Sequence, residues 1–157
     1  MYWFGMTPVQ LNILLVEDEP NDVFLIERAF RKCDCQHALH SVGDGEQAIC
    51  YLEGTREFAD SKKYPLPSLV LLDLKLPRRS GLEVLGWLRS RPDSLKRLPV
   101  IVLTSSKQAS DINRAYELGA NSYLVKPVAF DGLLDLVKAF NAYWANFNER
   151  PDFTPGR

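Results

Sequence analysis

The sequence predicts an α/β fold, a doubly wound five-stranded parallel sheet with helices on both faces. Short apolar runs alternate along the chain with longer amphipathic stretches, which is typical of a sheet built from strand–helix units. The runs are apolar throughout, as expected for parallel strands that are buried on both faces. For five such units we expect the flavodoxin-like strand order 2-1-3-4-5.

The first half of the chain contains two of these units. A strand is expected at residues 13–16 (ILLV), and residues 20–32 follow as a helix because their apolar residues recur at helical spacing. A weaker strand is expected at 38–42. The sequence DGEQ at 44–47 has the form of a capping box and begins the second helix. Residues 54–67 are polar and interrupted by prolines, so we expect a surface loop there.

The second half of the chain contains three more units. Strands are expected at 68–72 (SLVLL), at 100–103 (VIVL) after a proline, and at 123–125 (YLV). Helices are expected around 82–88, where leucines recur every three residues, around 112–119, where Gly119 closes the helix, and over 128–147.

Length and composition fit one globular domain with modest extensions. The chain has 157 residues, of which 46% are hydrophobic and 25% are charged. We assign residues 1–10 to an N-terminal extension, 11–147 to the domain and 148–157 to a C-terminal tail. The apolar start MYWF lacks the basic region of a signal peptide, and Met6 is an alternative first residue.

Composition also excludes several classes of partner. The net charge of −1 gives no excess of basic residues that would indicate nucleic-acid binding, and no apolar run is long enough to span a membrane. The three cysteines, Cys33, Cys35 and Cys50, lack the spacing of a metal site. Reduced thiols of this kind indicate a cytoplasmic protein.

Polar residues stand at the ends of four expected strands, where an open α/β sheet binds its ligands. Glu17 and Asp18 end the first strand, Asp73 the third and Thr104 the fourth, and Lys126 follows the fifth. Three carboxylates that converge repel one another unless a cation intervenes, and their oxygens suit Mg²⁺. Asp73 would act as a nucleophile that forms an acyl phosphate, while Lys126 and Thr104 would bind phosphoryl oxygens.

These residues lie within motifs that resemble the receiver domains of response regulators. The motifs are ILLVEDE, LLDLKLPRRSGLEVL, VIVLTS and SYLVKP, and the resemblance covers roughly residues 12–138. It implies a signalling switch rather than a classical enzyme, phosphorylated by a histidine kinase on Asp73. It also implies that Asp18, Asp73 and the carbonyl of Lys75 bind Mg²⁺ directly, with Glu17 acting through water.

The resemblance extends to the residues that would transmit the signal. It implies that Thr104 is the switch hydroxyl, Tyr123 the switch aromatic and Lys126 the phosphate partner. It further implies a cis peptide bond between Lys126 and Pro127, which proline makes affordable.

Two features narrow the resemblance. The long 54–67 loop and the aromatic final helix look most like small stand-alone receivers that are paired with bacteriophytochrome-type histidine kinases. No DNA-binding or enzymatic segment follows the last helix, so we expect output through partners or self-association.

The final helix suggests a homodimer. Phe140, Tyr143, Trp144 and Phe147 are spaced i, i+3, i+4 and i+7, which places them on one stripe of a helix. An exposed aromatic stripe usually marks an interface, and a two-fold dimer is the commonest closed arrangement. Alternatively, the MYWF segment or the 54–67 loop covers the stripe within the monomer.

Two other classes of protein, and a receiver that is not phosphorylated, are the alternative interpretations. A haloacid-dehalogenase-type phosphatase needs an acid two residues after its nucleophile, where this chain has Lys75. A flavodoxin-like FMN carrier needs a phosphate-binding loop after the first strand, where Glu17, Asp18 and Glu19 would repel a phosphate. A receiver that works without phosphorylation is the third alternative, although every expected site residue is present.

Overall fold

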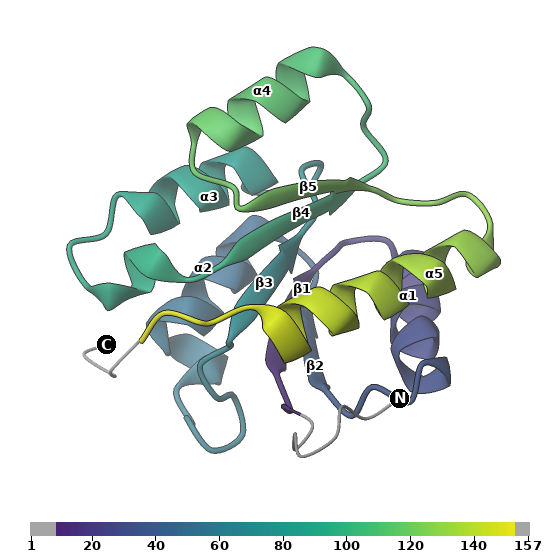
Figure 1. The fold of residues 1–157 in the computed structure, drawn as a ribbon. Coiled ribbons are helices and arrows are strands. Elements are labelled where there is room, and N and C mark those ends of the chain that lie inside the picture. The colour runs from purple at the N-terminus through teal and green to yellow at the C-terminus, as the bar shows by residue number, and fades with distance from the viewer. Residues whose placement is uncertain (1–8, 153–157) are drawn as a thin grey trace.

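The centre of the fold is a parallel sheet of five strands in the order β2-β1-β3-β4-β5, as predicted (Figure 1). We describe residues 9–152 from a computed structural model. The strands are β1 (Asn12–Val16), β2 (Ala38–Val42), β3 (Leu69–Leu72), β4 (Val100–Thr104) and β5 (Ser122–Val125). Val16 lies beside Leu72, and Leu72 lies beside Val102, so the carboxyl ends of the central strands are level with one another.

Helices cover both faces of the sheet (Figure 1). They are α1 (Pro20–Lys32), α2 (Gly45–Glu53), α3 (Gly81–Arg89), α4 (Ala109–Glu117) and α5 (Phe130–Phe140). Two 3-10 turns, η1 (Arg56–Phe58) and η2 (Ser94–Arg97), follow α2 and α3, and a π-helical segment, η3 (Asn141–Phe147), follows α5. The doubly wound fold class is therefore confirmed.

The core forms two layers, one on each face of the sheet. Leu14 and Val16 point into the layer beneath α2 and α3, whereas Ile13 and Leu15 point into the layer beneath α1 and α5. All four side chains are buried, which confirms that the apolar runs are strands covered on both faces.

Local hydrogen bonds set the helix ends. Asp44 accepts a bond from the backbone N–H of Gln47 at 2.8 Å and so begins α2 at the predicted place. A full capping box starts α3, where the Ser80 hydroxyl and the Glu83 carboxylate each accept a bond from the other residue's backbone N–H. Gly119 adopts a left-handed φ of 100° just beyond α4, at the predicted end of that helix.

Residues 54–67 form a mostly exposed surface loop, as predicted, but part of the loop packs against the core. Phe58 in this segment is buried and packs with Tyr51 of α2 at 5.2 Å between ring centroids. Tyr64 completes the cluster, 5.1 Å from Phe58. The segment thus covers part of the core beside α2, because its aromatic rings pack there while its polar residues remain at the surface.

The predicted helix over 128–147 is also corrected. It begins at Phe130, and its α-helical part ends at Phe140, where the chain continues as the π-helix η3. A π-helix has i→i+5 hydrogen bonds, so residues three and four apart no longer form one stripe. Phe140 is buried and packs edge-on against Phe30 of α1 at 5.6 Å, so it is not available as an interface residue.

The two ends of the chain lie outside the part that the structure describes. Residues 1–8 and 153–157 lie outside the described part of the chain, and with them most of the expected N-terminal extension, the MYWF segment and Met6. Among residues 9–152, no helix is both long and apolar enough to cross a bilayer.

Candidate functional site

A cluster of three carboxyl groups lies at the carboxyl ends of β1 and β3. Glu17 and Asp18 follow β1, and Asp73 follows β3, whose last residue pairs with the last residue of β1. Each of the three offers a carboxylate oxygen that lies within 4.8 Å of the others. Glu17 and Asp73 are buried, whereas Asp18 is exposed. The structure therefore brings together the three acids that sequence analysis selected.

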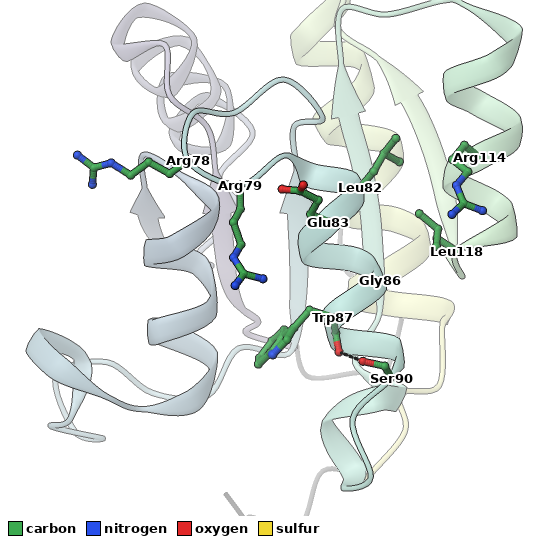
Figure 2. A pocket seen from close by; sticks show the side chains of 9 residues that line it. All are labelled: Arg78, Arg79, Leu82, Glu83, Gly86, Trp87, Ser90, Arg114 and Leu118. Atoms are coloured by element: carbon green, nitrogen blue, oxygen red, sulfur yellow. Dashed lines mark hydrogen bonds between the residues drawn. The ribbon is translucent and has the colours of Figure 1, made fainter.

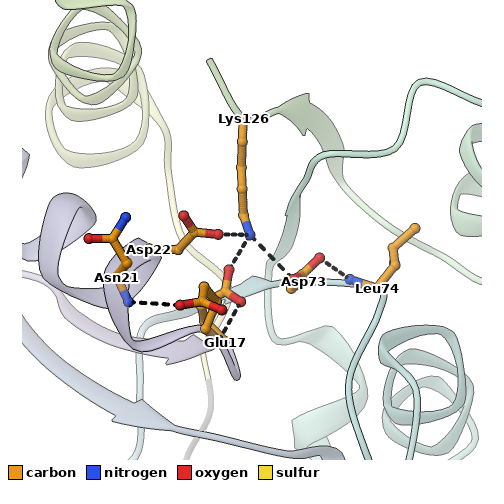
Figure 3. Close-up of polar contacts among 7 residues, drawn as sticks. Glu17, Asn21, Asp22, Asp73, Leu74 and Lys126 are labelled. Atoms are coloured by element: carbon orange, nitrogen blue, oxygen red, sulfur yellow. Dashed lines mark hydrogen bonds and ion pairs between the residues drawn. The ribbon is translucent and has the colours of Figure 1, made fainter. Parts of the chain in front are cut away.

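The side chain of Lys126 reaches into this cluster from the end of β5 (Figure 3). Its ammonium donates to Glu17, to Asp22 at 3.0 Å and to Asp73 at 3.3 Å. Burial opposes the charged form, but the hydrogen bonds to Glu17 and Asp22 and the charge of Asp73 outweigh it and raise the pKa of Lys126. Lys126 is therefore a permanent cation at this site.

Asp22 was not singled out in the sequence. It lies in the first turn of α1, and its carboxylate binds the same ammonium as Glu17 and Asp73. The signal that could have identified it is its position, since it lies only four residues after Asp18, at the start of α1.

Negative charge exceeds positive charge in this cluster. Burial, together with the charge of Asp73, raises the pKa of Glu17 to about 7 against the opposing hydrogen bond from Lys126. Within residues 9–152, four carboxyl groups (Glu17, Asp18, Asp22 and Asp73) lie around one ammonium, that of Lys126. Oxygen donors with a surplus of negative charge fit a hard divalent cation, so the donor set suits Mg²⁺.

The backbone fixes the orientation of Asp73. Its N–H donates to the carbonyl of Val16 at 3.0 Å, and its Oδ1 accepts a bond from the N–H of Leu74 at 2.7 Å. The chain then folds back so tightly that a Cβ on Gly81 would lie 2.1 Å from the carbonyl oxygen of Asp73. Oδ2 consequently points toward the ammonium of Lys126 (Figure 3).

The side chain of Lys75 takes no part in this network. It is exposed and forms no ion pair among residues 9–152. The lysine at this position therefore leaves the carboxylate cluster unchanged.

The two expected switch residues lie on neighbouring strands. Thr104, at the end of β4, is 1% exposed, and its carbonyl accepts a bond from the N–H of Lys126 at 2.8 Å. The hydroxyl of Tyr123 in β5 donates to the carbonyl of Ser106 at 2.9 Å. The Ser106 hydroxyl in turn contacts Asp111 of α4 at 2.5 Å, so the ring is linked to the start of that helix. Ser106 is a second residue that sequence analysis did not select.

The predicted cis bond before Pro127 is wrong. No cis peptide bond occurs between residues 9 and 152, so the bond from Lys126 to Pro127 is trans. The trans form is the more stable isomer even before proline, by about 0.5–1 kcal/mol, and here it still lets Lys126 reach the cluster.

Comparison with known proteins places the chain in a family. The response regulator receiver domain family matches residues 13–138. Response regulator Rcp1 of Synechocystis sp. is 39% identical over 132 residues, which cover 84% of this chain and 87% of that protein.

Solved structures agree with the sequence match. The phosphorylated cyanobacterial phytochrome response regulator RcpA superposes with a TM-score of 0.83 at 36% identity, covering 91% of this chain and 99% of the other. Response regulator RPA3017, from red light signalling in R. palustris, gives a TM-score of 0.84 at 34% identity over 90% and 99% of the two chains. The Mn²⁺-bound form of Rcp1 gives 0.80 at 35% identity, also over 90% and 99%.

The sheet order, the acidic cluster facing a lysine and the match over most of the chain agree with one another. The chain belongs to the response regulator receiver domain family.

Proposed function

We propose that this receiver accepts a phosphoryl group from a histidine kinase on Asp73. The observation that supports this most strongly is the orientation of that carboxylate, with Oδ1 held by the N–H of Leu74 and Oδ2 facing Lys126 at 3.3 Å. In the transfer, the P–N bond of the phosphohistidine breaks and a P–O bond to Asp73 forms. Lys126 would neutralise a phosphoryl oxygen as a point charge, since it stays protonated.

We further propose that Mg²⁺ binds at the acidic cluster. Asp18, Asp73 and the carbonyl of Lys75 would bind it directly, and Glu17 through water. When bound, it would screen the carboxylates from one another and polarise the incoming phosphoryl group. The related protein Rcp1 has been crystallised in a Mn²⁺-bound form, which supports a divalent metal at the equivalent cluster.

Intact-mass measurement after treatment with acetyl phosphate tests this function. We expect the mass of one phosphoryl group to be added in the presence of Mg²⁺ and not in excess chelator. Full phosphorylation in chelator would refute the role of the metal.

The donor is proposed to be a bacteriophytochrome-type kinase in the cytoplasm, since relatives such as RcpA are phytochrome response regulators. Two apolar side chains, Phe24 of α1 and Val128 just after Pro127, are exposed and would contact the kinase. Phe24→Asp should therefore slow transfer from the kinase while leaving transfer from acetyl phosphate intact. Equal loss with both donors would contradict a docking role.

The signal is proposed to pass through Thr104 and Tyr123. A phosphoryl group at Asp73 would draw the Thr104 hydroxyl inward, and the Tyr123 ring would turn into the vacated space and leave its bond to Ser106. A bias of a few kcal/mol is enough to shift such an equilibrium. Thr104→Ala should still be phosphorylated yet fail to change partner affinity. Normal signalling by this variant would exclude the route.

A homodimer through the C-terminal segment is the proposed form of self-association. Tyr143 and Phe147 of η3 are each more than half exposed, and Trp144 packs edge-on against Tyr143 at 5.2 Å. These three rings, without the buried Phe140, would form the interface.

A further inference from the structure

A groove on the outer face of α3 has no role in the function proposed above (Figure 2). Its volume is about 600 Å³, within the range of about 300–1,000 Å³ that is typical of binding sites. None of the residues that line it belongs to the acidic cluster. They are Arg78, Arg79, Leu82, Glu83, Gly86, Trp87, Ser90, Arg114 and Leu118.

The floor of the groove is the bare backbone of α3 at Gly86. A glycine within a helix destabilises it relative to alanine, so a helical glycine needs a reason. Gly45, Gly81 and Gly132 have one, because an added Cβ at each would lie within 2.9 Å of another atom. At Gly86 the nearest such atom is Cδ2 of Leu118 at 3.7 Å, an ordinary contact, and φ is not positive. The fold therefore does not require glycine at this position.

A glycine that the fold does not require is explained by close approach of another molecule to the helix backbone. Figure 2 shows that the two banks of the groove stand on either side of Gly86. Trp87 and Arg79 lie on the side of α2, and Arg114 and Leu118 extend from α4 on the other side. A segment passing over Gly86 would contact both banks.

Each bank carries an arginine that can pair with an acidic group of a ligand. Arg79 uses Nε for Glu46 at 2.5 Å, and Arg114 uses Nη1 for Glu117 at 3.4 Å. Both pairs are solvent-exposed, so each contributes little and can be exchanged. Within residues 9–152, their remaining N–H groups have no assigned acceptor, although a guanidinium carries five donors. The acid in the groove, Glu83, is already engaged in the capping box at the start of α3.

We propose that this α3–α4 groove binds an acidic amphipathic helix of a downstream partner protein. The backbone of the partner helix passes over Gly86, and its carboxylates pair with Arg79 and Arg114. One apolar side chain of the partner packs between Leu82 of α3 and Trp87. Tryptophan and arginine, which stand on the banks of this groove, are among the residues that most often dominate binding energy.

The banks of the groove are joined to the site of phosphorylation, which is why the occupant is expected downstream of it. Arg79 stands in the loop that follows Asp73, and α4 is tied through Asp111 and Ser106 to Tyr123. Phosphorylation should therefore change the affinity of the groove, and binding should change phosphorylation reciprocally. This coupling rests on the proposed function, whereas the groove itself does not.

The test selects acidic and neutral helical peptides from a displayed library against the full chain. Enriched peptides should carry acidic residues around one large apolar residue and should change the tryptophan fluorescence of the protein. Their affinity should fall at least tenfold for Gly86→Gln and for the Arg79→Ala, Arg114→Ala double variant. The matched charge control is Arg31→Ala, which removes an exposed arginine of α1. This variant should bind the peptides normally.

The Gly86→Ala variant tests whether a side chain at position 86 destabilises the fold by itself. It should unfold at the same or a higher urea concentration than the wild type, and a lower midpoint would overturn the argument that the fold does not need this glycine. Enriched peptides that are neutral, or that bind the Gly86→Gln variant normally, would overturn the groove. Self-association of the wild type that Gly86→Gln abolishes would replace the partner helix with a second copy.

Repeating the peptide measurement with phosphorylated protein tests the coupling to Asp73 separately from binding in the groove. Peptide affinity should change after acetyl phosphate treatment of the wild type and not of Asp73→Asn. An unchanged affinity in a sample whose mass shows phosphorylation would refute the coupling alone, because the unphosphorylated arm tests the groove independently.

Discussion

Replacing Lys126 by methionine removes the one ammonium among residues 9–152 that contacts the acidic cluster, while keeping a side chain of similar length. The wild-type ammonium binds Glu17, Asp22 at 3.0 Å and Asp73 at 3.3 Å. Removing one partner of a buried ion pair costs about 3–5 kcal/mol. The side chain of Asp22 is 33% exposed, and water there screens part of the loss. Protonation of Glu17, whose pKa is already about 7, relieves more. We therefore expect the free energy of unfolding to fall by roughly 2–3 kcal/mol.

Urea unfolding with and without Mg²⁺ measures this effect. With a slope of about 1–3 kcal/mol per M urea, the midpoint should drop by roughly 0.7–3 M in metal-free buffer. Mg²⁺ should recover more stability in the variant than in the wild type, because no ammonium then competes with it for the carboxylates. Lys107→Met is the control, since Lys107 is exposed and forms no ion pair within residues 9–152; it should change stability by less than about 0.5 kcal/mol. A metal-free Lys126→Met protein as stable as the wild type, or a deficit that Mg²⁺ leaves unchanged, would refute the reasoning.

Three further predictions concern stability and assembly. Arg89 donates four hydrogen bonds that join α3, η2 and the turn before β5, three of them to backbone carbonyls. Arg89→Met should therefore lower the free energy of unfolding by roughly 3 kcal/mol in urea titrations. A loss below about 1 kcal/mol would contradict this role. Burial lowers the pKa of His37 below 6.5 despite its bond to Asn141, so the folded state binds protons less readily than the unfolded chain. Stability should be full above pH 6.5 and fall as the pH drops below it, and His37→Gln should flatten that slope; an unchanged slope would exclude His37 as its source. Tyr143→Asp with Phe147→Asp should convert a dimer seen by light scattering into a folded monomer, whereas a wild type that stays monomeric when phosphorylated would exclude the dimer.

Much of the fold could be predicted because burial leaves a simple signal. Strands covered on both faces must be apolar throughout, so runs such as ILLV at 13–16 were visible without tertiary information. The acidic cluster followed from the strand order, because residues after neighbouring parallel strands meet at one edge of the sheet.

What could not be predicted depends on contacts between distant segments. Asp22 joins the site only because Lys126 reaches α1 from the end of β5, a contact between residues far apart in the chain. The aromatic stripe failed at Phe140 for a similar reason. Packing against Phe30 buries that ring, and the change to π-helix after it alters the spacing on which the stripe depended. The isomer before Pro127 is also a tertiary property, since both forms are accessible to an X–Pro bond.

The central claim is that Asp73 is the phosphoacceptor, and intact-mass measurement of Asp73→Asn tests it most directly. Asparagine keeps the size of the side chain and an oxygen that can accept the bond from the N–H of Leu74, so the variant should fold normally. With acetyl phosphate and Mg²⁺, the wild type should gain the mass of one phosphoryl group and the variant should gain none. An equal gain of mass by the Asp73→Asn protein would contradict the account.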